Sequence, residues 1–240
     1  MSPPDAPFEE PDPPLEDLRI ERHGNGVALV TLDLPARRNM MSAPMTASWA
    51  RLMSGLRTDP GLRCLVVTGA GSAFCAGGDT SWIGSQPEAG VDALRSRMLP
   101  FYRAWLAVRD LEVPTIAAIN GPAIGAGLAL ALACDLRYAA EDARLGVPFT
   151  SLGMHAGMAT TWLLPEVAGL GVARELLLTG RIVTGAQAVG LGLVNGSFPG
   201  DSLLAQVMVV ADVVAAAAPI ATRLTKVCLL YTSPSPRDRS

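Results

Sequence analysis

The sequence predicts an α/β protein in which parallel strands alternate with helices. Short apolar segments of strand length alternate along the chain with longer segments whose apolar residues recur at helical spacing. Strands that are separated by helices pair in parallel, because the helix returns the chain across the sheet. The chain has 240 residues, 50% of them hydrophobic, and its mean hydropathy is +0.32. This size and composition favour a folded chain of one large domain or two small ones over a disordered chain.

The individual elements follow from local pattern. Four short apolar segments indicate strands, and they span residues 26–33, 63–68, 115–119 and 135–138. Seven segments have the apolar spacing of helices, at residues 43–56, 91–108, 128–133, 160–168, 172–179, 186–189 and 202–218. Pro100 has no amide hydrogen, so the helix over 91–108 should bend or restart there. Helices dominate after residue 160, so the C-terminal part should be helical.

The two ends of the chain differ from its middle. Residues 1–17 hold six prolines among acidic residues, and we expect an extended, disordered arm because proline fixes φ and removes a donor. Residues 231–240 are polar and unpatterned, and they resemble translated sequencing-adapter sequence. We therefore expect one folded domain over 18–228 and a non-native tail over 229–240, the alternative being an ordinary disordered tail.

Charge and cysteine content disfavour several kinds of partner. The 19 basic and 22 acidic residues give a net charge of −3, which does not suggest a nucleic acid or a polybasic contact with a membrane. No apolar run reaches the roughly 18–20 residues of a membrane span. The four cysteines share no metal-ligand spacing, so we expect no metal site. Nothing resembles a secretory signal, and the expected compartment is the reducing cytoplasm.

Two glycine-rich segments follow predicted strands. In residues 68–79, Gly69 and Gly71 fit the start of a Gly-x-Gly-x-x-Gly dinucleotide motif, but Phe74 stands at its third position. The sequence also lacks the Tyr-x-x-x-Lys pair of short-chain dehydrogenases, the Gly-Lys-Ser/Thr of a P-loop and the Gly-x-Ser-x-Gly of a nucleophile elbow. Dehydrogenase, nucleoside triphosphate and serine hydrolase chemistry are therefore disfavoured.

The second glycine-rich segment spans residues 120–135 and opens a helix. Helix starts leave unpaired N–H groups and a partial positive charge. Two such turns could aim backbone amides at one oxygen, which is what stabilising an enolate or a tetrahedral oxyanion requires. The alternative is close packing of small residues, which would explain either segment taken alone.

Several motifs taken together carry a more specific signal. They lie at residues 35–39, 73–79, 120–135, 143–148, 152–158 and 174–181. With these motifs the chain resembles the crotonase, or enoyl-CoA hydratase/isomerase, superfamily over about residues 18–228. The resemblance implies the ClpP/crotonase spiral of ββα units with a helical C-terminal region. The match stops near Cys228, so we expect the closing helices to be shortened, as in a C-terminally truncated member.

The resemblance also implies an acyl-CoA site. The amides of Gly78 and Ala126 match the two donors that stabilise a thioester enolate. The substrate-binding residues implied by the family are Ala36, Arg38, Ala76, Gly77, Asp79, Gly125 and Phe149. Arg37 or Arg38 would meet the CoA phosphates, the alternative being two solvated loop arginines. For Asp79 the favoured alternative is capping of the following helix.

The chain departs from the family at its acid–base residues. The two glutamates of the hydratases fall at Ala129 and Phe149, which exchange no proton. His155 is the replacement candidate, with a loop-stabilising histidine as the alternative. We expect the remaining candidates to have structural roles. Glu141, Asp142 and Glu166 should lie on the surface, and Asp135 should hold a turn. Cys75 should pack as a small buried hydrophobic residue.

Two functions therefore stand side by side. The first is an acyl-CoA enzyme of hydratase/isomerase type with a backbone oxyanion hole and a role in fatty acid metabolism. The second is a non-catalytic CoA-ester-binding or assembly subunit that lost its glutamates. Neither needs a cofactor beyond the coenzyme A of the thioester. The family implies a homotrimer or hexamer when the native C-terminus is present, and fold membership leaves the reaction open.

Overall fold

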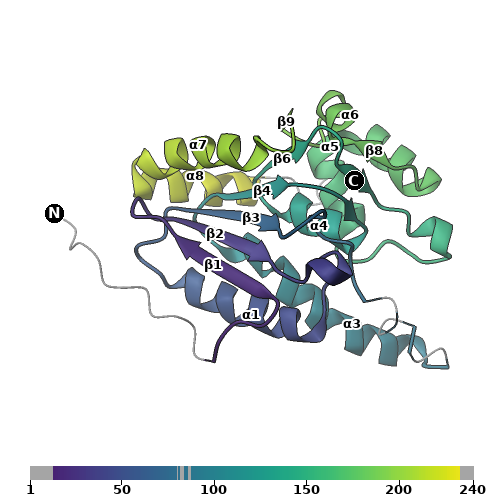
Figure 1. Ribbon diagram of the computed structural model, residues 1–240. Coiled ribbons are helices and arrows are strands. Elements are labelled where there is room, and N and C mark those ends of the chain that lie inside the picture. Colours follow the sequence, from purple (N-terminus) through teal and green to yellow (C-terminus); the bar gives the residue numbers. More distant parts are fainter. Residues whose placement is uncertain (1–12, 80, 82–83, 86–87, 233–240) are drawn as a thin grey trace.

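The main sheet confirms an α/β fold with parallel pairing (Figure 1). The computed structural model describes residues 13–79, 81, 84–85 and 88–232. The sheet has six strands in the order β1-β2-β3-β4-β6-β9. β1 pairs antiparallel with β2, and every other neighbouring pair is parallel. The strands are β1 (Leu18–Arg22), β2 (Val27–Leu32), β3 (Cys64–Gly69), β4 (Thr115–Ile119), β6 (Leu136–Ala140) and β9 (Gly196–Phe198).

A second, smaller sheet lies among the loops that follow these strands. Its three strands are β5 (Ala123–Ile124), β7 (Arg144–Gly146) and β8 (Val183–Thr184), in that order. β5 and β7 are parallel, whereas β7 and β8 are antiparallel. Sequence pattern did not reveal these strands because each has only two or three residues, which is too short for a period-2 signal.

Helices cover both faces of the main sheet. Figure 1 shows α7 and α8 on one face and α1 with α3 on the other. Within the described part of the chain, no single helix has both the length and the apolar character to span a membrane. α7 and α8 pass that test only as a pair, and the chain bends by 107° between them. The helices are α1 (Ala43–Arg57), α3 (Val91–Leu106), α4 (Ala126–Ala133), α5 (Thr160–Thr179), α6 (Gly185–Gly190), α7 (Leu203–Ala216) and α8 (Pro219–Thr232).

Two details go beyond the sequence expectation. α3 does not restart at Pro100 but continues through it, and Phe101 and Trp105 beyond the proline are buried against the core. Part of the expected N-terminal arm is fixed on α1, where the Glu16 amide donates to Ser48 Oγ at 2.8 Å. The rest of that arm, residues 1–12, lies outside the described residues, as do residues 233–240 of the expected tail. α8 itself runs past residue 228 to Thr232.

The last helix is attached to the sheet by a buried lysine. Lys226 Nζ lies 2.8 Å from Asp135 Oδ2 and also donates to the Val113 carbonyl oxygen at 2.8 Å. Asp135 Oδ2 in turn accepts hydrogen bonds from the amide and the hydroxyl of Thr115. The expected turn contact of Asp135 is therefore present, and it joins the end of α4, the start of β4 and α8.

We predict that Lys226→Met lowers the free energy of unfolding by about 2 kcal/mol, because hydrogen bonds of the buried ammonium are lost. Leu224→Ala is the matched control on the same helix, since Leu224 is exposed and its truncation should change stability by less than about 0.5 kcal/mol. Urea denaturation measures both. Equal stabilities of the two variants would contradict the anchoring role of Lys226.

Candidate active site

The two glycine-rich segments run side by side in the structure. Cys75 and Ala123 form a parallel β-bridge. The Cys75 amide donates to the Pro122 carbonyl oxygen at 3.0 Å, and the Ile124 amide donates to the Cys75 carbonyl oxygen at 3.1 Å. Residues 74–75 are thereby joined to residues 122–124 through backbone atoms. The two turns that follow these segments are therefore held beside each other.

Glycines permit this close approach. A Cβ atom on Gly127 would lie 2.1 Å from the Cys75 carbonyl oxygen, and one on Gly121 would lie 2.3 Å from the Ser72 carbonyl oxygen. Real Cβ atoms do not come so close, so a side chain at either position would push the segments apart. The packing interpretation of these glycines therefore holds, and the same packing aligns the turns at residues 77–78 and 125–126.

Two backbone amides lie at these turns. Ala126 is the first residue of α4, where N–H groups have no partner within the helix. Gly78 follows Gly77, whose φ of +98° suits only glycine. A Cβ on Gly77 would lie 3.5 Å from the Ala126 nitrogen, which shows how close the turns are. Among the described residues, neither the Gly78 nor the Ala126 amide donates to a protein acceptor.

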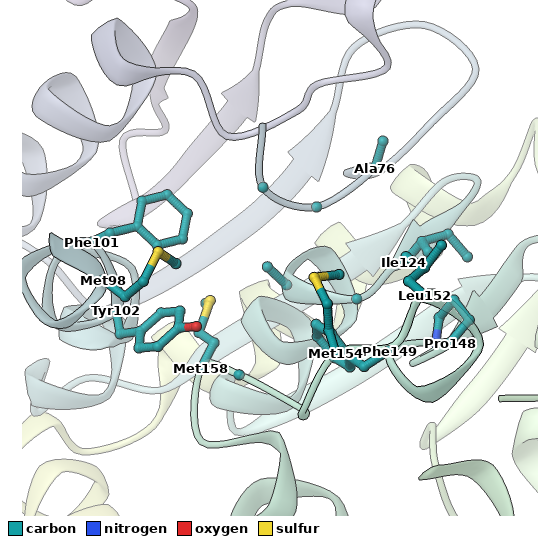
Figure 2. Close-up of a pocket in the computed structure, with 15 residues that line it drawn as sticks. Ala76, Met98, Phe101, Tyr102, Ile124, Pro148, Phe149, Leu152, Met154 and Met158 are labelled. Atoms are coloured by element: carbon teal, nitrogen blue, oxygen red, sulfur yellow. The ribbon is translucent and has the colours of Figure 1, made fainter. Parts of the chain in front are cut away.

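A cavity of about 90 Å³ opens beside the two amides (Figure 2). Its wall is almost wholly apolar. Tyr102 contributes the only polar side chain among the described lining residues. The wall consists of Ala76, Gly77, Gly78, Met98, Phe101, Tyr102, Ile124, Gly125, Ala126, Pro148, Phe149, Leu152, Met154, Gly157 and Met158.

The structure brings most of the expected site residues to this wall. Six of them line it, and these are Ala76, Gly77, Gly78, Gly125, Ala126 and Phe149. The Phe149 ring packs over Gly125, with its Cζ atom 3.6 Å from where a Cβ on Gly125 would be. Ala129, at the other glutamate position, is fully buried inside α4. No carboxylate therefore belongs to the described part of the wall.

The loop over residues 35–39, here called the early loop, lies next to the cavity rather than in it. The Ala76 amide donates to the Arg38 carbonyl oxygen at 3.0 Å, while Ala36 and Arg38 are exposed and do not line the wall. Arg37 Nη2 lies 3.5 Å from Asp79 Oδ2, so Arg37 has a carboxylate partner. No such partner of Arg38 is found among the described residues. Arg38 is thus the loop arginine available to an external anion.

Asp79 contacts the backbone that follows it, and the residues of the helix it was expected to cap lie partly outside the described residues. Its Oδ1 atom accepts a hydrogen bond from the Ser81 amide at 3.0 Å. Asp79 does not line the cavity, in contrast to the neighbouring Gly77 and Gly78. Its side chain therefore contacts the local backbone and Arg37.

His155 is not among the residues that line the cavity. Its side chain is exposed, whereas Met154 and Gly157 on the same loop line the wall. Residues 154–157 have no regular secondary structure, and Met154 lines the wall. A role of His155 in proton transfer stays a prediction.

The other candidate nucleophile and acids also lie away from reactive positions. Cys75 is fully buried, and desolvation raises the pKa of its thiol to about 12, so it is a thiol at neutral pH. Glu141, Asp142 and Glu166 are exposed, as the surface interpretation requires. Cys75 packs as a small hydrophobe beneath the first donor turn.

Sequence reasoning missed the part of the wall that α3 contributes. Met98, Phe101 and Tyr102 line the cavity, and Trp105 follows on the same helix face. Their spacing of three and four residues was a visible signal of one buried face. Burial raises the pKa of the Tyr102 phenol above its ordinary value, so it stays protonated at neutral pH.

The fold is that of the crotonase class, and solved structures of that class match the chain. An enoyl-CoA hydratase from Bacillus anthracis has a TM-score of 0.83 and 31% identity, covering 90% of this chain and 83% of that one. An enoyl-CoA hydratase/carnithine racemase from Magnetospirillum magneticum has a TM-score of 0.85 and 31% identity, covering 93% and 85%. The expected crotonase-like fold is confirmed.

The family follows from the sequence comparisons. The enoyl-CoA hydratase/isomerase family model matches residues 22–234. The (E)-benzylidenesuccinyl-CoA hydratase of Thauera aromatica is 36% identical over 206 residues, which are 84% of this chain and 78% of that protein. The chain belongs to the enoyl-CoA hydratase/isomerase family, whose members bind acyl-CoA substrates.

We predict that Gly127→Ala separates the two segments and destabilises the protein by about 2–3 kcal/mol, since the new methyl overlaps the Cys75 carbonyl oxygen. Gly55→Ala is the matched control. Gly55 lies inside α1 with no atom within 4 Å of the added Cβ, so the change should stabilise by about 0.5–1 kcal/mol. Thermal unfolding of both variants distinguishes overlap from a general effect of losing glycine.

Proposed function

We propose that the cavity binds an acyl-CoA thioester with its carbonyl oxygen between the Gly78 and Ala126 amides. One observation carries this proposal: two amides without protein acceptors meet at the wall of an apolar cavity. Such donors stabilise developing negative charge on an oxygen, and the partial positive charge at the start of α4 adds to the effect.

This arrangement supports chemistry through a thioester enolate. Hydrogen bonds to the carbonyl oxygen withdraw electron density and reduce the cost of negative charge at the α-carbon. Each donor in such a hole typically contributes about 3–4 kcal/mol to lowering the barrier. The apolar wall would strengthen both hydrogen bonds once the bound thioester displaces water from the donors. An acyl-CoA enzyme of hydratase/isomerase type is therefore our leading proposal.

The CoA portion would extend out of the cavity along the early loop. The carbonyl oxygen of Arg38 holds the Ala76 amide, so this loop borders the cavity wall. Arg38 is exposed, and its guanidinium has no ion-pair partner among the described residues. A guanidinium suits phosphate because it can donate two parallel hydrogen bonds. We assign the CoA phosphates to Arg38 rather than to Arg37.

A non-catalytic acyl-CoA binder is the second proposal, and the composition of the cavity wall favours it. The described wall contains neither carboxylate nor imidazole, because Phe149 and the fully buried Ala129 stand at the glutamate positions and His155 is exposed. Loss of a positioned acid–base group typically costs about 10²–10⁴-fold in rate. Binding would survive that loss, since the two amides and the apolar wall do not depend on it.

Assembly, location and pathway are finer parts of the proposal. A homotrimer or hexamer, a cytoplasmic location and a role in fatty acid metabolism are what the family resemblance implies. For self-association there is one supporting feature, an exposed apolar surface on the last two helices. It is formed by Val209 and Val213 of α7 and by Ile220, Leu224 and Leu229 of α8. Exposed apolar patches of this kind often mark protein contacts.

We predict that the carbonyl stretch of a bound acyl-CoA thioester shifts to lower wavenumber and that Ala126→Pro reduces this shift. Proline is compatible with the first position of a helix, so the change removes one N–H donor with little effect on α4. Ala126→Val keeps the donor and adds similar bulk, and it should keep the shift. Infrared difference spectra of the three complexes provide the test, and an equal shift in all three would contradict the oxyanion hole.

We predict that hydration of crotonyl-CoA is far slower than the roughly 10 s⁻¹ that is ordinary for enzymes, because no glutamate activates water. The same assay on enoyl-, dienoyl- and β-keto-acyl-CoA esters separates the two proposals. Turnover of any ester that falls at least about a hundredfold in Ala126→Pro supports the enzyme. Binding of the esters without turnover supports the non-catalytic binder, and rapid crotonyl-CoA hydration would contradict the prediction.

A further inference from the structure

Three methionine side chains contribute sulfur atoms to the cavity wall. Met98 comes from α3, whereas Met154 and Met158 come from the loop over residues 153–158. Figure 2 shows Met154 near the middle of the lined space, and Met98 beside Phe101 at one end. A thioether is apolar enough for such a wall, and its flexible chain fills irregular space. Unlike the hydrocarbon side chains around it, a thioether can also be oxidised.

The three thioethers differ in their access to solvent. Met154 and Met98 are partly exposed, whereas Met158 is 1% exposed. Residues 154–157 have no regular secondary structure, and the Met154 amide donates to the Phe149 carbonyl oxygen at 2.9 Å. This hydrogen bond holds the Met154 backbone next to the wall. A small oxidant in solution therefore reaches Met154 and Met98 more readily than Met158, because oxidation follows exposure.

Methionines elsewhere in the chain provide a contrast. Met208 on α7 is also partly exposed, but it lies outside the wall. Three further methionines are buried in the core with at most 2% exposure, and these are Met41, Met45 and Met53. Among the described methionines that are partly exposed, only Met154 and Met98 line the cavity. Oxidation of the folded protein should therefore change the cavity through these two residues.

Hydrogen peroxide converts a thioether into a sulfoxide. The sulfur forms a bond to one peroxide oxygen as the O–O bond breaks, so the sulfur loses two electrons and the peroxide is reduced to water. The product at Met154 is a polar side chain whose oxygen accepts hydrogen bonds. Its possible donors in the cavity are water, the Tyr102 hydroxyl and the amides of Gly78 and Ala126. A bound acyl thioester would displace the water and occupy the amides, so it competes with the sulfoxide oxygen for donors.

Resting on the proposed function, we propose that oxidation of Met154 by peroxide switches off the binding of acyl thioesters. The reduced thioether completes an apolar wall that accepts an acyl group, and the sulfoxide makes this wall polar. Met154 rather than Met98 carries the switch, because its place near the middle of the lined space puts the new oxygen among more of the wall. The switch is reversible, since methionine sulfoxide reductases restore the thioether while a dithiol is oxidised to a disulfide and water is released.

The test measures butyryl-CoA binding by titration calorimetry before and after treatment with hydrogen peroxide. Mass spectrometry of peptides from the treated protein should find sulfoxide at Met154 and little at Met158. We expect the affinity to fall at least about tenfold, and to recover after treatment with methionine sulfoxide reductases of both stereospecificities and dithiothreitol. Dithiothreitol alone is the control, because it reduces disulfides formed by the exposed Cys228 but not sulfoxides.

Three variants identify the sulfur responsible. Each is compared with itself before and after peroxide, so an effect of the substitution on binding itself cancels. Met154→Leu removes the oxidisable sulfur and should keep its own affinity within about twofold on treatment. Met208→Leu is the matched control outside the wall, and its affinity should fall on treatment as that of the unchanged protein does. Met154→Gln places a polar group of similar length in the wall and should weaken binding without peroxide, which tests the same cause if Met154→Leu alters folding.

The outcomes separate this inference from the function on which it rests. Failure of the untreated protein to bind butyryl-CoA would contradict the proposed function and, with it, the switch. Absence of sulfoxide at Met154, unchanged affinity after its oxidation, or an equal fall in Met154→Leu would overturn the switch and leave acyl-CoA binding intact. A fall that the reductases reverse, that is absent in Met154→Leu and that remains in Met208→Leu supports both.

Discussion

The site depends on direct backbone contact between residues 72–75 and residues 121–127. No side chain separates the two segments, because Gly121 and Gly127 face carbonyl oxygens of Ser72 and Cys75. The bridge between Cys75 and Ala123 fixes their register. Since backbone atoms are joined to backbone atoms, the distance between the two donor turns does not rely on flexible side chains. Preorganisation of this kind is what lets dipoles stabilise charge without first having to reorient.

Because this contact is made by backbone atoms, apolar residues at the two positions that the family resemblance assigns to glutamates do not disturb it. Ala129 is fully buried within α4 and contributes only packing, and Phe149 packs over Gly125 at the cavity wall. Neither residue takes part in the contact between the segments. Replacement of a carboxylate by an apolar group removes proton transfer from the cavity and lowers its polarity. If the proposed function holds, hydrogen bonds from the Gly78 and Ala126 amides are stronger in such surroundings, so a bound carbonyl would still be polarised without a carboxylate in the wall.

Sequence reasoning succeeded where pattern or motif is local. The four predicted strands and the two donor turns are present, because buried strands have continuous apolar runs and the turns carry distinctive glycines. It failed where tertiary packing decides. α3 passes through Pro100 because Phe101 and Trp105 pack in the core, and the three short strands of the second sheet have too few residues for any period. His155 and Tyr102 show the same limit, since a loop histidine lies outside the cavity and a helix tyrosine lines it.

The cavity therefore has two parts with different origins. The turns at residues 77–78 and 125–126 come from the glycine motifs, whereas α3 supplies Met98, Phe101 and Tyr102 to the wall. A change on α3 alters this part of the wall, while the backbone contact that positions the two amides stays as it is.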